Sequence, residues 1–507
     1  MKKSALAVVA TVCVVAVLFA SFIAFNEEGN GSEGFILIHT NDTHCYYDNE
    51  DGLGFSTVKG LKDRSIEDGN VTFLVDAGDF IQGNAYGTLT SGEASVDVMN
   101  TVGYDVGIPG NHEFDYSFDV LLENTSKLNF PIICSNLIYK TTGESVYPEY
   151  LVLEKSGMKI GFFGLLTPDT EVEVRSGFMG DSTITDPIDA AERMVSTLSK
   201  MDVDYIVALS HLGVGRDASI TSDQLCSIVD GIDIMVDGHS HTEMEDGKVC
   251  DGSIELIPSD TIIVSSGCYN KNVGVVTVTS DGDISAKLYR GDRIDDPVVD
   301  AVVDEVTERV NELLKEKVGH TDIFLDGARE NVRTKETNLG DFVTDAMRIA
   351  AGTDVALTNG GGIRTSIDVG DITLKNVYDL NPFLNTLLVF EVTGKDLKDE
   401  MEFSYSKYGE KFGGFLQVSG MVVKYDPTKA VGSRIVSIEI NGKIIGDDDA
   451  FTIVTTDYIA KGGDGNTVLL EKTGKVIGEQ LLCLADYFRN TENITDSTIQ
   501  MGRLISV

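Results

Sequence analysis

The sequence predicts an α/β protein with two domains joined by a helix, and three observations support this expectation. The chain has 507 residues, more than a single hydrophobic core usually organises. From residue 35 to about residue 293, short apolar runs of strand length alternate with stretches of helical pattern. Between residues 297 and 318 the pattern changes to apolar residues at helical spacing, which predicts an amphipathic helix between two domains.

The chain begins with a basic and then an apolar segment. Met1 is followed by two lysines, and residues 5–25 carry no charge, a length that matches the about 20 apolar residues needed to span a bilayer. Large residues stand three positions before the candidate cleavage sites, so we expect an uncleaved signal-anchor, with a cleaved signal peptide as the alternative. In both cases the chain beyond the polar spacer, which ends at residue 33, is expected outside the cytoplasm.

The first domain is expected over residues 34–295. Its apolar runs have the length and the β-branched content of buried strands. The runs lie at 35–39, 71–75, 159–163, 205–209, 232–236 and 261–265. Several of them end in glycine, aspartate or histidine, so polar side chains follow the expected strands directly.

A linker helix is expected over residues 296–318. Val298, Val302, Val306 and Val310 recur at helical spacing between charges, and Gly319 follows as the expected C-cap. The second domain is then expected over residues 319–507. It opens with a helical pattern at 338–351 and continues with strand-like runs at 354–357 and 386–390.

The charge of the chain restricts its ligands. It has 81 acidic and 40 basic residues, a net charge of -41. An acidic surface repels the phosphates of a nucleic-acid polymer, so no such partner is expected. A small phosphorylated substrate meets the same repulsion and requires metal ions or a local basic patch. The oligomeric state and the pairing of the cysteines stay open at the level of the sequence.

Polar residues gather in the loops of the first domain, and most of them directly follow an expected strand. They are Asp42, His44, Asp79, Asn111, His112, Asp115, His211, His239 and His241. The carboxyl ends of strands are where open α/β sheets bind ligands. Residues two apart in an extended chain point the same way, so His239 with His241, like Asp42 with His44, can reach one ion. Imidazole, carboxylate and amide ligands suit Mn²⁺, Zn²⁺, Fe²⁺ or Co²⁺, so the sequence predicts a metal site.

These motifs resemble a known signature. The set Asp-x-His, Gly-Asp, Gly-Asn-His-Glu, a single histidine and Gly-His-x-His is similar to the calcineurin-like metallophosphoesterase pattern. The second domain adds Asn-Gly-Gly-Gly-Ile-Arg at 359–364, Gly-Phe-Leu-Gln-Val-Ser-Gly at 414–420 and Gly-Gly-Asp-Gly at 462–465. Together these motifs resemble the 5'-nucleotidase family, which includes bacterial UDP-sugar hydrolases and animal ecto-5'-nucleotidases. The resemblance covers nearly the whole chain after the expected anchor.

The resemblance implies a fold and a dinuclear metal site. The first domain would be a β-sandwich flanked by helices, and the second an α/β substrate-binding domain. One divalent ion, such as Mn²⁺ or Zn²⁺, would be held by Asp42, His44, Asp79 and His241. The other would be held by Asp79, Asn111, His211 and His239, so that Asp79 bridges the two ions. His112 would stabilise the transition state or the leaving oxygen, with Asp115 orienting its imidazole.

The resemblance also implies a substrate pocket on the second domain. Arg364 would bind the phosphate, because a guanidinium pairs with phosphate in fork geometry. Phe415 and Tyr458 would hold the base between two aromatic faces. The other expected substrate contacts are Asn359, Gly361, Asp464 and Lys407, the last where relatives can carry an arginine. A domain rotation about the linker helix would bring this pocket to the metals.

The leading hypothesis is therefore an extracytoplasmic 5'-nucleotidase that converts nucleoside monophosphates to nucleoside and phosphate. A UDP-sugar hydrolase and a 2',3'-cyclic phosphodiesterase with 3'-nucleotidase activity are close alternatives that share the metal site. A thiosulfate-ester hydrolase is a more distant alternative within the fold. A surface binding protein without catalysis is the alternative from a different class.

Overall fold

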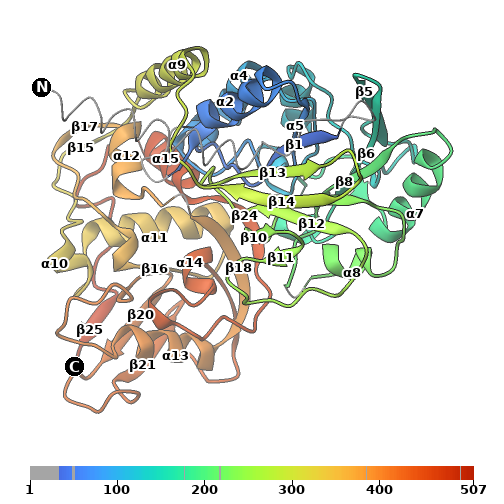
Figure 1. The fold of residues 1–507 in the computed structure, drawn as a ribbon. Helices are drawn as coiled ribbons and strands as arrows, with labels where there is room; N and C mark the ends of the chain where they lie inside the picture. Colours follow the sequence, from blue (N-terminus) through green and yellow to red (C-terminus); the bar gives the residue numbers. More distant parts are fainter. Residues whose placement is uncertain (1–33, 48–51, 176, 216–217, 384, 492) are drawn as a thin grey trace, which may run out of the picture.

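The computed structural model describes residues 34–47, 52–175, 177–215, 218–383, 385–491 and 493–507 (Figure 1). The expected anchor at 5–25 and the spacer up to residue 33 lie outside the described residues. Within the described part, no helix combines the length and the apolar character that crossing a membrane requires. The described cysteines are free thiols.

Two β-sheets packed face to face form the core of the first domain. The strand orders are β14-β13-β1-β2-β3 and β11-β10-β12-β9-β8-β6-β5. The first sheet contains β1 (Phe35–Thr40), β2 (Val71–Asp76), β3 (Val106–Gly107), β13 (Val273–Val278) and β14 (Ile284–Tyr289). The second contains β5 (Tyr150–Lys155), β6 (Met158–Leu166), β8 (Tyr205–His211), β9 (Ile234–Asp237), β10 (Glu243–Glu245), β11 (Lys248–Val249) and β12 (Ile262–Ser266).

The space between these sheets is filled by large apolar side chains. Phe35 and Phe73 of the first sheet belong to one buried cluster with Phe162 and Val207 of the second. Helices cover the two outer faces, which gives the strands apolar neighbours on both sides. The expected β-sandwich flanked by helices is thereby confirmed.

Five helices provide this cover. α2 (Gly54–Glu67), α4 (Glu93–Val102) and α9 (Pro297–Leu313) pack on the first sheet. α7 (Pro187–Leu198) and α8 (Ser222–Cys226) pack on the second. The shorter elements are α3 (Ala85–Thr90), η1 (His112–Phe114), α5 (Phe118–Ser126), α6 (Thr170–Glu173) and the paired strands β4 (Leu137–Tyr139) and β7 (Ser182–Ile184).

The six strands expected in the first domain all form, as β1, β2, β6, β8, β9 and β12. Their pairing places the polar motifs together. β1, β2 and β3 run parallel in the first sheet, and β6, β8, β9 and β12 run parallel in the second. The carboxyl ends of parallel strands meet at one edge, so the loops after these strands lie next to one another.

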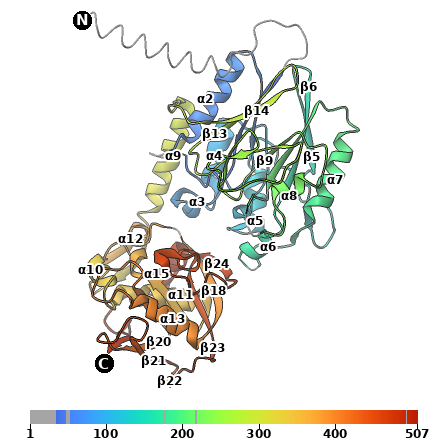
Figure 2. The same ribbon diagram turned by 60° about the horizontal axis from the view of Figure 1, so that its bottom comes forward.

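α9 connects the two domains (Figure 2). The helix begins with Pro297 after Asp296, whose side chain accepts hydrogen bonds from the backbone N–H groups of Val298 and Val299. Val299, Val303 and Val306 are buried in the core of the first domain, whereas Val310 belongs to the core of the second. One amphipathic helix therefore contributes to both cores.

The expected end of this helix is wrong. The helix ends at Leu313, and Gly319 lies inside β15 (Lys317–Thr321) instead of capping a helix. β15 pairs antiparallel with β17 (Gly370–Thr373). The apolar spacing continues through Val318, but a β-branched residue is equally suited to a strand, and the tertiary pairing decides between the two.

A five-stranded sheet of order β19-β16-β23-β18-β24 organises the second domain. Its strands are β16 (Val355–Asn359), β18 (Thr386–Thr393), β19 (Leu416–Ser419), β23 (Ala450–Thr456) and β24 (Lys475–Glu479). α11 (Asn338–Ala351), α12 (Leu374–Leu380) and α15 (Gln480–Asn490) cover one face. The expected helix at 338–351 forms with the expected bounds, and the runs at 354–357 and 386–390 form β16 and β18.

The other face of this sheet carries α13 (Gly394–Ser404) and a small four-stranded sheet. The small sheet contains β20 (Met421–Tyr425), β21 (Ile435–Ile440), β22 (Lys443–Ile444) and β25 (Leu504–Ser506). The loops of this domain contain four short helical turns, α10 (Arg329–Val332), η2 (Gly360–Gly362), α14 (Asp457–Ala460) and η3 (Gly463–Gly465).

Candidate metal centre and nucleotide pocket

The structure brings the candidate ligands of the first domain into two adjacent groups. Asp42, His44 and His241 form one group, and Asp79, His211 and His239 form the other. Within each group the potential ligand atoms lie within 4.8 Å of one another. The groups also adjoin, because Asp79 Oδ2 lies 3.9 Å from His44 Nε2 and 3.0 Å from His211 Nε2. Asp79 thus stands between them, where a bridging ligand belongs.

Backbone carbonyl groups orient two of the imidazole rings. His44 Nδ1 donates a hydrogen bond to the carbonyl oxygen of Gln82 at 2.8 Å. His211 Nδ1 donates to the carbonyl oxygen of Ala77 at 2.7 Å. Since a carbonyl oxygen only accepts, both rings carry the proton on Nδ1 and present Nε2 to the site. This is the tautomer that a metal-ligating histidine uses.

The loops that hold these residues have unusual backbone geometry. Asp42, His44, Asp79, His239 and His241 all have positive φ angles, between 49° and 70°. Such angles cost energy in residues other than glycine, and strain of this kind concentrates at functional sites. The loops also pack closely, because a Cβ on Gly110 would lie 2.2 Å from Asp79 Oδ1, so a side chain would not fit there.

The polar groups of the site fit a cation. Asn111 Oδ1 is buried and has no hydrogen-bond partner among the described residues. An amide oxygen without a partner is costly in a protein interior, and a metal ion satisfies it. Imidazole nitrogen, carboxylate and amide oxygen together are a donor set for Mn²⁺, Zn²⁺, Fe²⁺ or Co²⁺.

The pKa values of the histidines also indicate that the buried carboxylates favour nearby positive charge. Burial lowers the pKa of His211, but Asp79 and Asp42 outweigh it and the pKa rises to about 10. The pKa of His241 also rises to about 10, because the hydrogen bond and the charge of Asp42 outweigh burial. Burial keeps the pKa of His44 low, at about 4. The carboxylates therefore require nearby cations, supplied either by protons or by metal ions.

His112 and Asp115 form a pair beside the candidate ligands. His112 Nδ1 donates to Asp115 Oδ2 at 2.6 Å, and the ring centroids of His112 and His44 lie 5.2 Å apart. The backbone N–H of His112 also donates to Asp79 Oδ1 at 2.9 Å. The carboxylates of Asp115 and Asp79 overcome the effect of burial and raise the pKa of His112 to about 10. The imidazole is thus oriented by one carboxylate and kept cationic next to the site.

Two residues that support this centre received no role from the sequence. Glu113 is fully buried, and its carboxylate accepts backbone N–H bonds from Asp79, Phe80, Ile81 and Gly110. It thereby ties the loop of Asp79 to the loop of Asn111. Asn41 donates to Asp42 Oδ2 at 2.7 Å. A polar residue within two positions of a candidate ligand, in a motif that is otherwise assigned, is the signal that would have indicated both.

The second domain collects most of the expected substrate contacts around Asp464. Asn359 Nδ2 donates to Asp464 Oδ2 at 3.0 Å, and the backbone N–H of Asp464 donates to the hydroxyl of Tyr458 at 3.1 Å. Gly361 stands in η2 directly after Asn359. The structure therefore brings together motifs that lie about a hundred residues apart in sequence.

The remaining expected contacts differ in exposure. Arg364 is exposed, donates to the carbonyl oxygen of Gly361 at 3.3 Å and stacks over Phe383. Tyr458 is 43% exposed, whereas Phe415 is 3% exposed and packs edge-on against Tyr405. Of the two expected aromatic faces, Tyr458 alone is open in this arrangement. Lys407 Nζ lies over the ring of Phe412, 4.7 Å from its centroid.

Two arginines that the sequence motifs did not indicate join this region. Arg329 begins α10 and Arg333 follows it as the C-cap. Burial lowers the pKa of Arg333, the charges of Arg329 and Arg364 lower it further, and Asp464 opposes them. Arg333 is thus influenced by the charges of two other guanidinium groups. An Arg-x-x-x-Arg spacing on one helical face is the signal that predicts such a basic patch.

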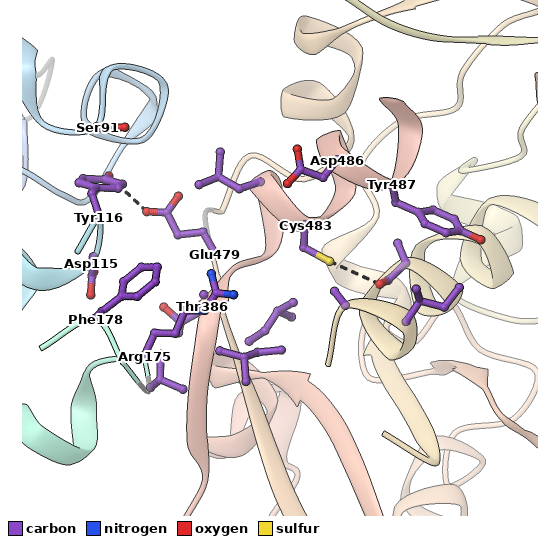
Figure 3. Close-up of a pocket in the computed structure, with 18 of the residues that line it drawn as sticks. Ser91, Asp115, Tyr116, Arg175, Phe178, Thr386, Glu479, Cys483, Asp486 and Tyr487 are labelled. Carbon is purple, nitrogen blue, oxygen red and sulfur yellow. Dashed lines mark hydrogen bonds between the residues drawn. The ribbon is translucent and has the colours of Figure 1, made fainter. Parts of the chain in front are cut away.

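A cavity of about 450 Å³ separates parts of the two domains (Figure 3). Asp115 and Tyr116 line it from the first domain, and Glu479 lines it from the second. Glu479 Oε1 accepts hydrogen bonds from Tyr116 and Gln82, both at 3.3 Å. No hydrogen bond between described residues joins Arg364, Tyr458 or Asp464 to a candidate metal ligand. The candidate ligands belong to the first domain, and Arg364, Tyr458 and Asp464 belong to the second.

Comparison with known proteins identifies both domains. Residues 36–243 match the family described as calcineurin-like phosphoesterase, and residues 317–471 match the 5'-nucleotidase, C-terminal domain. The chain is 30% identical to a 5'-nucleotidase of Diplobatis ommata over 490 residues, which covers 85% of this chain and 83% of that protein. It is 33% identical to the trifunctional nucleotide phosphoesterase protein YfkN of Bacillus subtilis, covering 93% of this chain but 34% of that longer protein.

Solved structures agree with this assignment. The chain superposes on the 5'-nucleotidase precursor of Thermus thermophilus with a TM-score of 0.56 and 28% identity, covering 94% of this chain and 99% of that one. The NAD nucleotidase of Haemophilus influenzae shares the fold, with a TM-score of 0.71 at 20% identity and coverages of 94% and 100%. The fold and the site define a metallophosphoesterase hydrolase. The chain belongs to the 5'-nucleotidase family.

Proposed function

We propose that this protein is a 5'-nucleotidase that hydrolyses nucleoside monophosphates to nucleoside and phosphate, with two divalent metal ions as cofactors. The observation that carries the proposal is the pair of adjacent ligand groups that meet at Asp79. Asp42, His44, Asp79 and His241 would hold one ion, and Asp79, Asn111, His211 and His239 the other. When bound, the ions would activate the attacking water and neutralise charge on the phosphoryl oxygens.

The residues around this centre have roles that follow from their geometry. His112 is positioned by Asp115, so in its protonated form its Nε2–H can stabilise negative charge on the leaving oxygen or on the transition state. The backbone bonds to Glu113 hold Asp79 and Gly110 at fixed distances, which keeps the ligand groups aligned before substrate arrives.

The second domain would recognise the nucleotide. Arg364 would bind the phosphate as a bidentate donor, supported by the charge of Arg329 and Arg333. Tyr458 and Phe415 would bind the base, while Asp464 and Asn359 would bind hydroxyl or base donors. A patch of arginines also overcomes the repulsion between a phosphate and a chain of net charge -41. Because the pocket and the metal ligands belong to different domains, which α9 joins, we propose that a rotation about α9 brings them together.

We also propose that the protein acts outside the cytoplasm, anchored by the segment at residues 5–25. The uncharged length of this segment and the preceding lysines support the proposal. Treatment of intact cells with a protease tests it. Degradation of the catalytic domains without lysis is the expected result, and full protection would contradict an external location.

An assay of phosphate release by the purified full chain tests the activity. We expect Mn²⁺- or Zn²⁺-dependent release from AMP that chelation abolishes. UDP-glucose and 2',3'-cyclic AMP belong in the same assay, because faster turnover of either one would assign the site to the corresponding alternative. If no substrate reacts with metal loaded, the chain is a binding protein and the proposal fails.

A further inference from the structure

A buried carboxyl group that forms no ion pair with the described residues contacts the loop of Asp464 in the proposed nucleotide pocket. Glu400 stands on α13, is 1% exposed, and neighbours Leu397 and Met401 of the domain core. Its Oε1 atom has no hydrogen-bond partner among the described residues. Its Oε2 atom accepts one hydrogen bond, from Asn466 Nδ2 at 2.6 Å. Burying an ionisable group with so few partners costs stability, so a role for the single hydrogen bond to Asn466 has to be sought.

Asn466 closes the loop that carries Asp464. It is 2% exposed, and its backbone N–H donates to the carbonyl oxygen of Gly463 at 3.0 Å. Its side-chain oxygen accepts from the backbone N–H of Val468 at 3.0 Å. Both ends of the Asn466 side chain are therefore fixed, one by the chain that follows the loop and one by Glu400.

The local sequence of this loop does not by itself stabilise the conformation that the loop adopts. Asp464 has a φ of 57°, in the left-handed region that a non-glycine residue adopts at a cost. Its neighbours Gly462 and Gly465 have φ values of 90° and 87°. A short, glycine-rich turn of this kind is flexible in isolation. Contacts at its ends must therefore hold Asp464 toward Asn359 and Tyr458.

The same helix supports the other side of the pocket. Ser404, the last residue of α13, accepts a hydrogen bond from the backbone N–H of Leu416 at 2.8 Å. Tyr405, the C-cap, packs its ring against Phe415 with centroids 5.4 Å apart. The C-terminal end of α13 thus contacts the segment of Phe415. Near the middle of the same helix, Glu400 contacts the loop of Asp464.

We propose that Glu400 is a positioning residue for nucleoside binding, which acts through Asn466 to hold the loop that presents Asp464 and Tyr458. The inference rests on the proposed function, because it assigns these loops to the nucleoside. Loss of the contact between Glu400 and Asn466 should weaken binding of the nucleoside and leave the reaction at the metal ions unchanged. Glutamine retains an acceptor oxygen and the length of the side chain, whereas leucine fills the site without an acceptor.

Steady-state kinetics of the full chain test this role. With AMP, we expect Glu400→Leu to raise KM at least about tenfold and to change kcat less than about threefold. Glu400→Gln should stay within about threefold of the wild type in both constants. Asp399→Asn is the matched control, because Asp399 is the preceding residue on α13 and pairs with Lys395 in its own helix. Its constants should equal those of the wild type.

A substrate without a nucleoside separates positioning from general damage. Hydrolysis of p-nitrophenyl phosphate uses the metal centre and the phosphate contacts but no nucleoside contact, so Glu400→Leu should leave it within about twofold of the wild type. A parallel loss with AMP and p-nitrophenyl phosphate would overturn the inference, and so would an unchanged KM for AMP. If Glu400→Leu does not fold, Asn466→Ala removes the same bond from the other side, and an unchanged KM there would equally overturn it.

The outcomes distinguish this inference from the proposed function. If the wild type releases no phosphate from AMP but hydrolyses p-nitrophenyl phosphate, the nucleotidase proposal fails and the inference fails with it. If the wild type hydrolyses AMP and Glu400→Leu matches it, the inference alone fails.

Discussion

The two halves of the proposed site are built in different ways. In the first domain, Asp42, Asp79 and His211 are at most 1% exposed, and partners within their own domain fix them. In the second domain, Arg364 is exposed and held by one long hydrogen bond and by stacking over Phe383, and Tyr458 is 43% exposed. The chemistry is thus prearranged, whereas recognition depends on side chains that substrate must order. Changes in the two halves should therefore affect different kinetic constants.

The largest effect is expected at Asp79. Replacing it with alanine removes the carboxylate that adjoins both ligand groups, so both ions should be lost. We expect kcat to fall by about 10⁴ or more, since the metal-assisted chemistry disappears. Metal analysis of the dialysed variant together with AMP turnover checks this. A variant that keeps two ions and full activity would remove Asp79 from the proposed bridge.

The next effect is expected at His112, which contributes to chemistry and does not bind metal in this account. Alanine in its place should lower kcat by about 10²–10⁴ while the metal content stays at the wild-type level. Asp115→Asn should have a smaller effect in the same direction, because the imidazole remains but loses its orienting charge. His320→Ala, at an exposed histidine far from the ligands in sequence, is the control. Loss of metal in His112→Ala would make it a ligand.

Changes in the exposed half should act on KM. Tyr458→Ala removes an aromatic face worth about 1–3 kcal/mol per base, which corresponds to about a 5- to 150-fold rise in KM for AMP. Arg364→Lys keeps the charge but loses the bidentate fork, so a smaller rise is expected. Both variants should keep their two metal ions. A fall in kcat with an unchanged KM would contradict the assignment of substrate binding to the second domain and of the chemistry to the first.

The smallest effect is a pH dependence of stability in the second domain. Burial, with Asp396 and Asp399 adding to it, raises the pKa of Glu400 from 4.5 to about 7. The native state therefore holds this proton more tightly than the unfolded state does. Stability from this group is full below about pH 4.5 and is lost as the pH rises through 7.

Glu400→Gln does not titrate and should lose less stability over this window. Comparing thermal unfolding midpoints at pH 5 and pH 8 checks the difference, which we expect to be a few degrees, at about 2–4 °C per kcal/mol. Equal pH dependence in the Glu400→Gln variant and the wild type would mean that Glu400 is ionised throughout.

The contrast between the halves also explains what the sequence could predict. Strands of the first domain are continuous apolar runs, and each ends in the polar motif that it presents, so Asp42, Asp79 and His211 could be placed from order alone. The β-sandwich followed from the resemblance to the phosphoesterase family. The end of α9 was misplaced because Val318 suits a helix and a strand equally, and pairing with β17 decides.

Other features depended on tertiary contacts that a single sequence does not contain. The role of Glu113 follows from four backbone donors that come from two separate loops. The near-complete burial of Phe415 depends on Tyr405, and the charge cluster of Arg333 with Arg364 depends on how α10 packs. In the sequence, Glu400 likewise looks like an ordinary glutamate of a helix, because only the tertiary structure shows that its side chain is buried.

The metal content of the active protein tests the central claim most directly. The full chain would be dialysed against metal-free buffer until activity is stable, and metal per chain would then be measured by mass spectrometry alongside AMP turnover. The account predicts two divalent ions per active chain and a loss of activity in proportion to metal removed. Full activity with one ion, or with none, would contradict a dinuclear centre at Asp79.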